Sequence, residues 1–155
     1  MTLSWKQLVL VATLGSVALL GGAFIFQALG YAPCKMCYWQ RYPHAVAIGI
    51  GVLALALGRK WLAWFGALAA AVTSGIGMFH SGVERGWWEG PASCTGGSTA
   101  GMSADDLMNQ IMSAPLVRCD EIPWQMLGLT MANLNAIFSL VLVVIWVMAA
   151  RRLAA

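Results

Sequence analysis

Two cysteines separated by two residues mark the stretch of this sequence most suited to chemistry, APCKMCYWQRYPH, residues 32–44. A pair spaced like Cys34 and Cys37 can exchange disulfides or bind a metal. It makes a poor structural crosslink, because so short a ring restrains almost no chain entropy. Arg41 follows four residues after Cys37, so on a helix the guanidinium and both sulfurs would share a face. A cation and a helix N-terminus both stabilise the attacking thiolate, which favours redox chemistry.

A second pair of cysteines, Cys94 and Cys119, has 24 residues between its members. A disulfide joining them would close a loop of about 26 residues and stabilise the chain by roughly 3–4 kcal/mol in the loop-entropy treatment. Zinc sites usually combine two close pairs, and here only His80 offers an additional ligand near the second pair. We therefore predict no metal site. Four cysteines permit three disulfide connectivities, and the sequence leaves the choice open.

The composition places these cysteines in a membrane protein. The chain has 155 residues, of which 60% are apolar and 10% charged, and its mean hydropathy is +0.74. Soluble domains contain about 25% charged residues. Four apolar runs reach the roughly 20 residues that a helix needs to cross a bilayer, at about 8–29, 42–58, 61–80 and 124–148. The second is the shortest, because only 17 residues lie between Arg41 and Arg59.

The runs are apolar on every side, whereas the strands of a membrane barrel alternate between lipid and lumen faces. We therefore predict an all-α integral membrane protein, with residues 1–155 forming a single membrane domain. Its core would be a bundle of four transmembrane helices.

The charges predict the orientation of this bundle. Five of the nine basic residues lie in three short segments on one side, namely Lys6, Arg59, Lys60, Arg151 and Arg152. The six acidic residues fall in one long loop on the other side, namely Glu84, Glu89, Asp105, Asp106, Asp120 and Glu121. Short basic loops stay in the cytoplasm, so we expect both termini there and the loops at about 30–41 and 81–123 outside. The net charge of +3 then reflects topology and gives no reason to expect nucleic-acid binding.

The long outer loop contains two further patterns. CTGGSTAG, residues 94–101, has three glycines that would let the loop move. SADDLMNQIMSA, residues 103–114, begins with a possible capping box of Ser103 and Asp106 and places its apolar residues on one face. It predicts a short amphipathic helix, either lying on the outer leaflet or packed on the ends of the bundle.

With the spans and cysteines in place, the sequence resembles the bacterial disulfide bond formation protein B (DsbB) family. The resemblance rests on Cys34 to Arg41 as a C-x-x-C-x-x-x-R element, on His80 some 14 residues before Cys94, and on Cys119 followed by DEIPWQMLGL. It covers nearly the whole chain. Gln40 departs from the pattern, since the best-known members have an acidic residue there. We expect this change to alter hydrogen bonding to a quinone headgroup without removing activity.

The resemblance implies a quinone-dependent generator of protein disulfides in the bacterial inner membrane, with both outer loops in the periplasm. Its partners would be a periplasmic DsbA-like protein of the thioredoxin fold and a membrane quinone, either ubiquinone or menaquinone. Carried over to this chain, Cys94 and Cys119 would meet the partner, and Cys34 and Cys37 would meet the quinone. Cys37 would be the thiolate beside the quinone ring. Two further residues would contribute to the quinone site, Arg41 and His80.

Three other interpretations compete with this one. A substrate-dedicated thiol oxidoreductase would use the same chemistry on one protein. A vitamin K epoxide reductase-like enzyme would also use two pairs of cysteines on a related four-helix core. In this chain, however, the second pair follows the C-x-x-C motif and spans a long loop, which is the order expected of the DsbB family. A non-enzymatic membrane scaffold with two static disulfides would have no use for the C-x-x-C ring or for Arg41.

Overall fold

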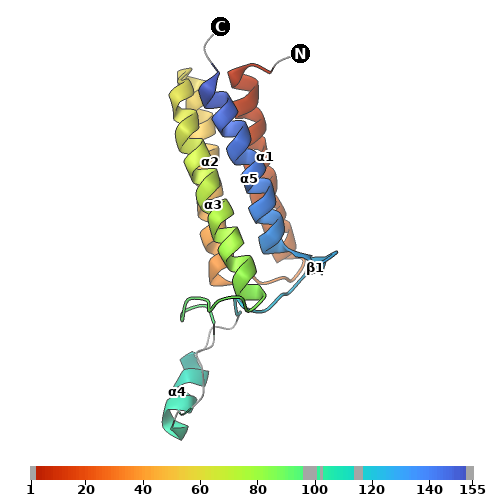
Figure 1. The fold of residues 1–155 in the computed structure, drawn as a ribbon, viewed down its shortest axis with the longest axis vertical. Coiled ribbons are helices and arrows are strands. Elements are labelled where there is room, and N and C mark those ends of the chain that lie inside the picture. The colour runs from red at the N-terminus through yellow and green to blue at the C-terminus, as the bar shows by residue number, and fades with distance from the viewer. Residues whose placement is uncertain (1–2, 96–100, 102, 114–116, 153–155) are drawn as a thin grey trace.

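The structure, a computed structural model, describes residues 3–95, 101, 103–113 and 117–152. Four long helices run side by side in a bundle (Figure 1): α1 (Trp5–Ala28), α2 (Lys35–Leu57), α3 (Ala63–Glu84) and α5 (Met131–Arg151). α1 and α3 each pack against both α2 and α5. The shorter elements are η1 (Lys60–Leu62), α4 (Ala104–Ser113), β1 (Gln125–Met126) and β2 (Leu129–Thr130). The start of α1 and the end of α5 lie at the same end of the bundle.

Local capping sets several helix ends. Before α1, the Ser4 hydroxyl accepts from the Gln7 backbone N–H at 3.3 Å, and the Gln7 side chain accepts from the Ser4 N–H at 2.8 Å. Thr130 and Asn133 form the same reciprocal pair at the start of α5. Gly58 ends α2 with a left-handed φ of 63°, a conformation that costs glycine little.

α2 begins seven residues before the predicted start of the second apolar run. Cys34 is its N-cap, and the Cys34 sulfur accepts a hydrogen bond from the Cys37 backbone N–H at 3.3 Å. Pro43 lies inside the helix instead of in its first turn. Most of the predicted outer link at 30–41 is therefore helical, because a sulfur replaces the usual oxygen cap.

The last helix begins later than predicted. Residues predicted at the start of the span at 124–148 instead form a hairpin in which Gln125 pairs with Thr130. Its turn residues, Leu127 and Gly128, have φ values of 52° and 77°, as two-residue turns of this kind require. α3 in turn continues past residue 80 to Glu84, whose carboxylate accepts a 2.5 Å hydrogen bond from the Thr130 hydroxyl.

Three segments of the described chain are long and apolar enough to cross a membrane: α1, Lys60–Glu84 and α5. The sequence predicted a fourth span at 42–58, and α2 does not meet the same criterion. It is 23 residues long, but its first half carries Lys35, Gln40, Arg41 and His44. These polar residues lower its hydropathy below that of the other three helices. The structure is thus that of a mostly helical membrane protein with three candidate spans among the described residues.

The main hydrophobic core lies toward the end of the bundle where α1 begins and α5 ends. Its largest member is Trp146, which is fully buried among small residues such as Ala67 and Ala70. Gly66 on α3 lets the indole approach, because a Cβ at that position would lie 2.6 Å from the ring. Small residues thus bring the helices close together, as in other membrane bundles.

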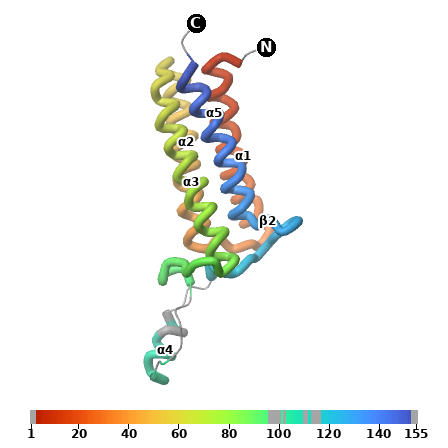
Figure 2. The backbone as a smooth tube through the Cα atoms, viewed as in Figure 1, coloured from red at the N-terminus to blue at the C-terminus, as the bar shows by residue number. Residues whose placement is uncertain are grey.

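α4 stands apart from the bundle, beyond the end opposite the start of α1 (Figure 2). Ser103 precedes it and accepts from the Asp106 N–H at 3.2 Å. Leu107, Met108 and Met112 are exposed, so α4 is not packed on the bundle ends, one of the two positions considered above. A position on the outer leaflet stays a prediction. Five residues of the glycine-rich stretch at 94–101, residues 96–100, lie outside the described residues.

Candidate functional site

All four cysteines meet at the end of the bundle opposite the start of α1. Cys34 and Cys37 are free, and their sulfurs lie 2.8 Å apart. Cys94 and Cys119 form a disulfide. Both disulfide cysteines and Cys34 are buried in one small core cluster, and Cys37 packs against it. The fold therefore brings the two pairs of cysteines together. Of the possible disulfides, the structure contains the one between Cys94 and Cys119.

The two free thiols differ in acidity. Both lie ahead of the predicted span at 42–58, Cys34 as the N-cap of α2 and Cys37 in its first turn. The hydrogen bond between the sulfurs raises the pKa of Cys34 far above that of an ordinary thiol, and burial acts in the same direction. The same hydrogen bond lowers the pKa of Cys37, and the Arg41 guanidinium adds to this effect while burial opposes it. Cys37 is thus the more acidic of the two thiols and the one that loses its proton first.

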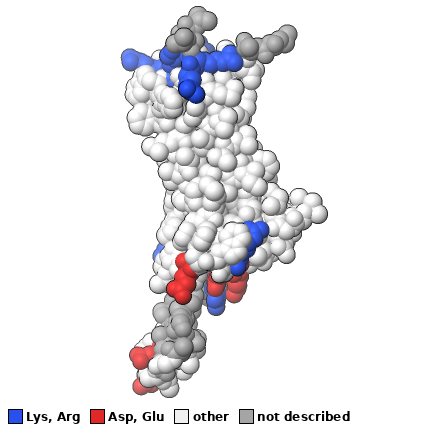
Figure 3. Space-filling view, viewed as in Figure 1, with Lys and Arg blue, Asp and Glu red and all other residues white. Residues whose placement is uncertain are grey.

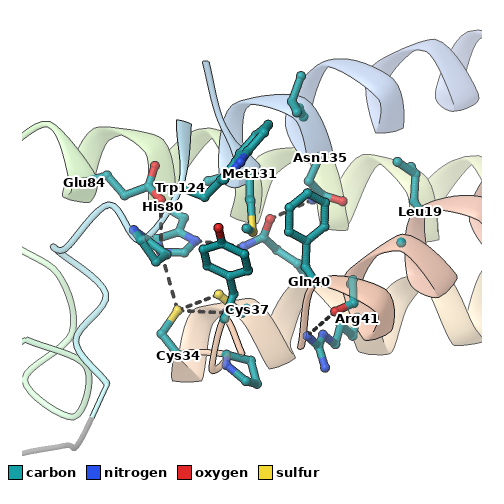
Figure 4. A pocket seen from close by; sticks show the side chains of 18 of the residues that line it. Leu19, Cys34, Cys37, Gln40, Arg41, His80, Glu84, Trp124, Met131 and Asn135 are labelled. Atoms are coloured by element: carbon teal, nitrogen blue, oxygen red, sulfur yellow. Dashed lines mark hydrogen bonds and ion pairs between the residues drawn. The ribbon is translucent and has the colours of Figure 1, made fainter. Parts of the chain in front are cut away.

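These sulfurs border a cavity of about 360 Å³ (Figure 4). Its walls come from the second half of α1, the first turns of α2 and α5, the last turns of α3, and residues 117–124. Most of the lining is apolar, and a few polar groups converge on it. They include Cys37, Gln40, Arg41, His44, His80, Glu84 and Asn135. An apolar cavity of this size with a few placed polar groups is typical of small-molecule sites.

His80 connects the cysteines to the rest of the cavity. Its side chain is 4% exposed, and its Nε2 lies 3.6 Å from the Cys34 sulfur and 4.0 Å from a Glu84 carboxylate oxygen. Its Nδ1 lies 2.9 Å from the Gln40 side-chain nitrogen. Figure 4 shows the ring between Cys34 and Glu84, with Gln40 on its other side.

Backbone carbonyls fix the orientation of the two amides in this site. Gln40 Nε2 donates to the Met36 carbonyl at 3.2 Å, so Gln40 Oε1 is free to accept from Asn135 Nδ2 at 2.8 Å. Asn135 Nδ2 also donates to the Thr73 carbonyl at 3.3 Å. Because Gln40 presents an N–H to His80, the Nδ1 of that ring is an acceptor. The proton of the neutral ring therefore sits on Nε2 and points at the Cys34 sulfur.

Arg41 is held between α1 and α2. Nη1 donates to the Gln27 side-chain oxygen at 2.6 Å, and Nη2 donates to the Ala23 carbonyl at 3.1 Å. The guanidinium also lies 5.0 Å from the Phe24 ring centroid and 5.3 Å from that of Tyr38. Its Nε is buried and has no partner among the described residues. Arg41 is thus a fixed cation in the cavity wall, with one donor available to a ligand.

Three potential metal ligands lie close together, but their chemistry does not suit a metal. The ligand atoms of Cys34, Cys37 and His80 lie within 4.8 Å of one another. A metal-bound histidine donates its other ring N–H to an acceptor. Here Gln40 faces Nδ1 with a donor, which keeps the proton on Nε2, where a metal would need the lone pair. With its proton on Nε2, His80 has no lone pair there to offer a metal.

The structure brings together every residue that the sequence proposed for the site, and it adds three. Cys34, Cys37, Arg41 and His80 line the cavity, and the Cys94–Cys119 disulfide packs beside it. Sequence reasoning assigned Glu84 to the outer loop, gave His44 no role and did not consider Asn135. For His44 and Asn135 the available signal was their position within apolar runs, because polar residues are costly in a membrane and often functional.

Comparisons with known proteins agree with this arrangement. A family model described as "Disulfide bond formation protein DsbB" matches residues 5–149. Disulfide bond formation protein B of Polaromonas sp. (strain JS666 / ATCC BAA-500) is 31% identical over 144 residues, which cover 83% of this chain and 80% of the relative. The protein of the same name from Acidovorax sp. (strain JS42) is 28% identical over 159 residues, with 90% and 84% covered.

An uncharacterized protein of Rickettsia prowazekii (strain Madrid E) is 26% identical over 145 residues, again with 90% and 84% covered. No solved structure gives a significant match. The family model spans nearly the whole chain and thereby confirms the resemblance seen in the sequence. This chain belongs to the DsbB family of disulfide bond formation proteins.

Proposed function

We propose that this protein is a dithiol:quinone oxidoreductase of the bacterial inner membrane. It would re-oxidise a periplasmic DsbA-like protein of the thioredoxin fold and pass the electrons to a membrane quinone. One observation carries the proposal: the free Cys34–Cys37 pair faces an apolar cavity, and the Cys94–Cys119 disulfide packs directly behind it. This arrangement places one pair beside a small apolar oxidant. The other pair is buried in the described structure and would be uncovered when a protein partner binds.

The proposal includes four membrane spans in a single domain, with α2 as the fourth. α2 packs along α1 and α3, so it lies at the same membrane depth as its neighbours. Figure 3 shows Lys and Arg without Asp or Glu at the end where α1 begins, whereas the other end carries Asp and Glu together with further Lys and Arg. The basic end would face the cytoplasm, together with both termini. The cysteines and the loops around them would then face the periplasm, where disulfides persist.

The cavity fits a quinone headgroup on observations of the structure alone. Its walls are largely apolar, and two of the residues that line it, Arg41 and His44, each have a buried nitrogen, Nε and Nδ1, without a hydrogen-bond partner among the described residues. Buried polar atoms of this kind usually find a partner, and a bound ligand would supply one. A bound quinone would accept two electrons and two protons. Ubiquinone and menaquinone both have this chemistry, and both remain candidates.

The reaction begins at the Cys94–Cys119 disulfide. A partner thiolate would attack Cys94, forming a mixed disulfide and releasing Cys119 as the thiolate. The second partner thiol would then displace Cys94, so the partner leaves oxidised and this pair holds two electrons. Exchange with a Cys34–Cys37 disulfide would pass those electrons to the inner pair, as the shared cluster of sulfurs permits.

The reduced inner pair is arranged to deliver electrons into the cavity. Cys37, whose pKa is lowered, would react as the thiolate, and Arg41 would stabilise negative charge that develops on a ligand oxygen. When Cys37 gives up its electrons, Cys34 loses its proton and closes the Cys34–Cys37 bond. The His80 Nε2–H, 3.6 Å from the Cys34 sulfur, would stabilise that sulfur while it is an anion.

A scaffold with static disulfides is disfavoured by the same geometry. Cys34 and Cys37 are free thiols, and a charged guanidinium is fixed next to an apolar cavity. A purely structural protein gains nothing from either feature. Membership of the DsbB family also separates the chain from the vitamin K epoxide reductase-like alternative.

Anaerobic turnover tests the proposal. Purified protein would be mixed with a reduced thioredoxin-fold oxidase and either a benzoquinone or a naphthoquinone, and both thiol loss and quinone reduction would be followed. We expect the two signals to advance together with at least one quinone class. Cys37→Ser should abolish quinone reduction while the partner still forms a mixed disulfide with Cys94. The proposal fails if neither quinone class supports turnover.

A further inference from the structure

His44 is the buried cavity residue that the proposed mechanism does not use. It lies on α2, one helical turn beyond Gln40, and is 2% exposed. Its ring lines the same cavity as Cys37 and Arg41. Its Nδ1 is fully buried and has no partner among the described residues, whereas its Nε2 lies 2.9 Å from Asn135 Oδ1. Buried polar atoms usually have a partner, so we take a ligand atom as the missing partner of this nitrogen, which belongs to a residue that lines the cavity.

The hydrogen-bond network shows whether His44 Nδ1 carries a proton. Asn135 must use its nitrogen to reach the Thr73 carbonyl and Gln40 Oε1, so its oxygen faces His44. An oxygen can only accept here, and His44 Nε2 must therefore carry the proton. In the neutral ring, Nδ1 is then a bare acceptor. The other polar partner of the ring is the Ser139 hydroxyl, so no charged group lies against it to favour an imidazolium.

A bare acceptor discriminates between the two redox forms of a quinone. The oxidised ring presents carbonyl oxygens, which are acceptors and cannot bond to Nδ1. The reduced ring presents hydroxyl groups, which can donate to it. On the basis of the proposed function, we propose that His44 Nδ1 forms a subsite for a ring hydroxyl, so that the cavity binds a hydroquinone more tightly than the corresponding quinone.

This selectivity has a consequence for the direction of electron flow. A site that prefers the reduced form makes the bound quinone a stronger oxidant, because binding energy is released as the ring is reduced. For a two-electron couple, a tenfold ratio of dissociation constants corresponds to about 30 mV. The subsite would thereby help to draw electrons from a partner that is itself a strong oxidant.

Equilibrium binding tests the subsite without turnover. In a Cys37→Ser background, which blocks electron transfer, the dissociation constants of a short-chain ubiquinone and of its hydroquinone would be measured under anaerobic conditions. Quenching of tryptophan fluorescence provides the signal, since Trp124 lines the cavity. We expect the hydroquinone to bind about tenfold more tightly, the size of one buried hydrogen bond. His44→Phe should lower that ratio toward one by weakening hydroquinone binding alone.

Ser74→Ala provides a matched control. Ser74 is also a buried polar residue between α3 and α5, but it bonds to the Ala136 carbonyl and does not line the cavity. It should leave both constants unchanged. If His44→Phe weakens the quinone as much as the hydroquinone, or changes neither, the subsite is refuted while the proposed function stands. If neither form binds to the parent protein, both proposals fail.

Nitrogen-15 NMR offers a test that needs no substitution at His44. The chain has two histidines, so a His80→Gln sample assigns the spectrum. We expect His44 to be neutral with its proton on Nε2, and its Nδ1 resonance to shift when hydroquinone is added but not when quinone is added. A proton on Nδ1 in the free protein, or equal shifts with both forms, would overturn the inference.

Discussion

The sulfurs of Cys34 and Cys37 share a hydrogen bond, and this bond makes the acidities of the two thiols differ. The 2.8 Å contact raises the pKa of Cys34 and lowers that of Cys37, which borders the cavity. Arg41, fixed by α1, adds a smaller contribution of the same sign. The reactivity of Cys37 therefore depends first on its neighbouring thiol and second on the guanidinium.

This order predicts how alkylation depends on pH. In a background with Cys94→Ala and Cys119→Ala, Cys37 should react with iodoacetamide with a midpoint below about 8.5, the value of an ordinary cysteine. A lowered pKa keeps the thiolate present as the pH falls. Cys34→Ala should raise the midpoint more than Arg41→Gln does, because the sulfur contact is the larger cause. Mass spectrometry of the modified peptide provides the rates, and the reverse order would contradict the assignment.

Gln40 controls the tautomer of His80, and this leads to a second prediction. A carboxylate in Gln40→Glu cannot donate to His80 Nδ1, so the ring proton should move to Nδ1 and leave Nε2 as a bare ligand beside Cys34 and Cys37. We expect the zinc affinity of the reduced protein to rise about tenfold or more, the scale of outer-shell effects on metal sites. Competition with a chromophoric chelator measures it. Unchanged affinity would show that Gln40 does not set the tautomer.

At this scale the sequence identified the reactive groups but not their relationships. The C-x-x-C spacing, Arg41 and the distant cysteines were visible as residue types. The network of Gln40, Asn135 and His44 was not, because it joins residues up to 95 positions apart, a separation that no local pattern encodes.

Among the elements, close helix contacts depend on residues without side chains. Gly66 on α3 meets the Trp146 ring of α5, whereas Gly75 on the same helix has open space around it. We expect Gly66→Ala to destabilise the fold by about 1–3 kcal/mol, because a rigid indole must move to admit a methyl group. Thermal unfolding in detergent measures the loss.

Gly75→Ala is the matched control for that substitution. Its added methyl meets no neighbour, and alanine is the better helix former by about 1 kcal/mol. Its melting temperature should equal or exceed that of the parent. Similar losses at both positions would mean that the Gly66–Trp146 contact does not determine the packing of α3 on α5.

The element boundaries show what periodicity and hydropathy detect and what they miss. Both identified the long helices, since apolar runs of this length have few alternatives. They placed the start of α2 too late, because a cysteine sulfur caps it and Pro43 lies within it. They placed the start of α5 too early, because residues 125–130 form a hairpin whose turn depends on Gly128. Capping and turns depend on single residues, which an average over a window conceals.

For the molecule as a whole, the separation of charge predicts its orientation in the membrane. In a background without native cysteines, Glu89→Cys should react with an impermeant maleimide in intact cells. Trp61→Cys, at the opposite end and exposed, should react only after the membrane is permeabilised. Mass tagging on a gel distinguishes the two. Labelling of Trp61→Cys from outside would show that the topology is the reverse of the predicted one, with the native cysteines in the reducing compartment.

The central claim is that electrons leave the chain through the Cys34–Cys37 pair. Its most direct test is an anaerobic single turnover in which protein reduced at this pair is mixed with one equivalent of quinone. Hydroquinone would be measured by absorbance and the disulfides by non-reducing peptide mapping. We expect one hydroquinone for each Cys34–Cys37 disulfide formed and none with Cys37→Ser. Formation of that disulfide without hydroquinone, or equal quinone reduction by Cys37→Ser, would contradict it.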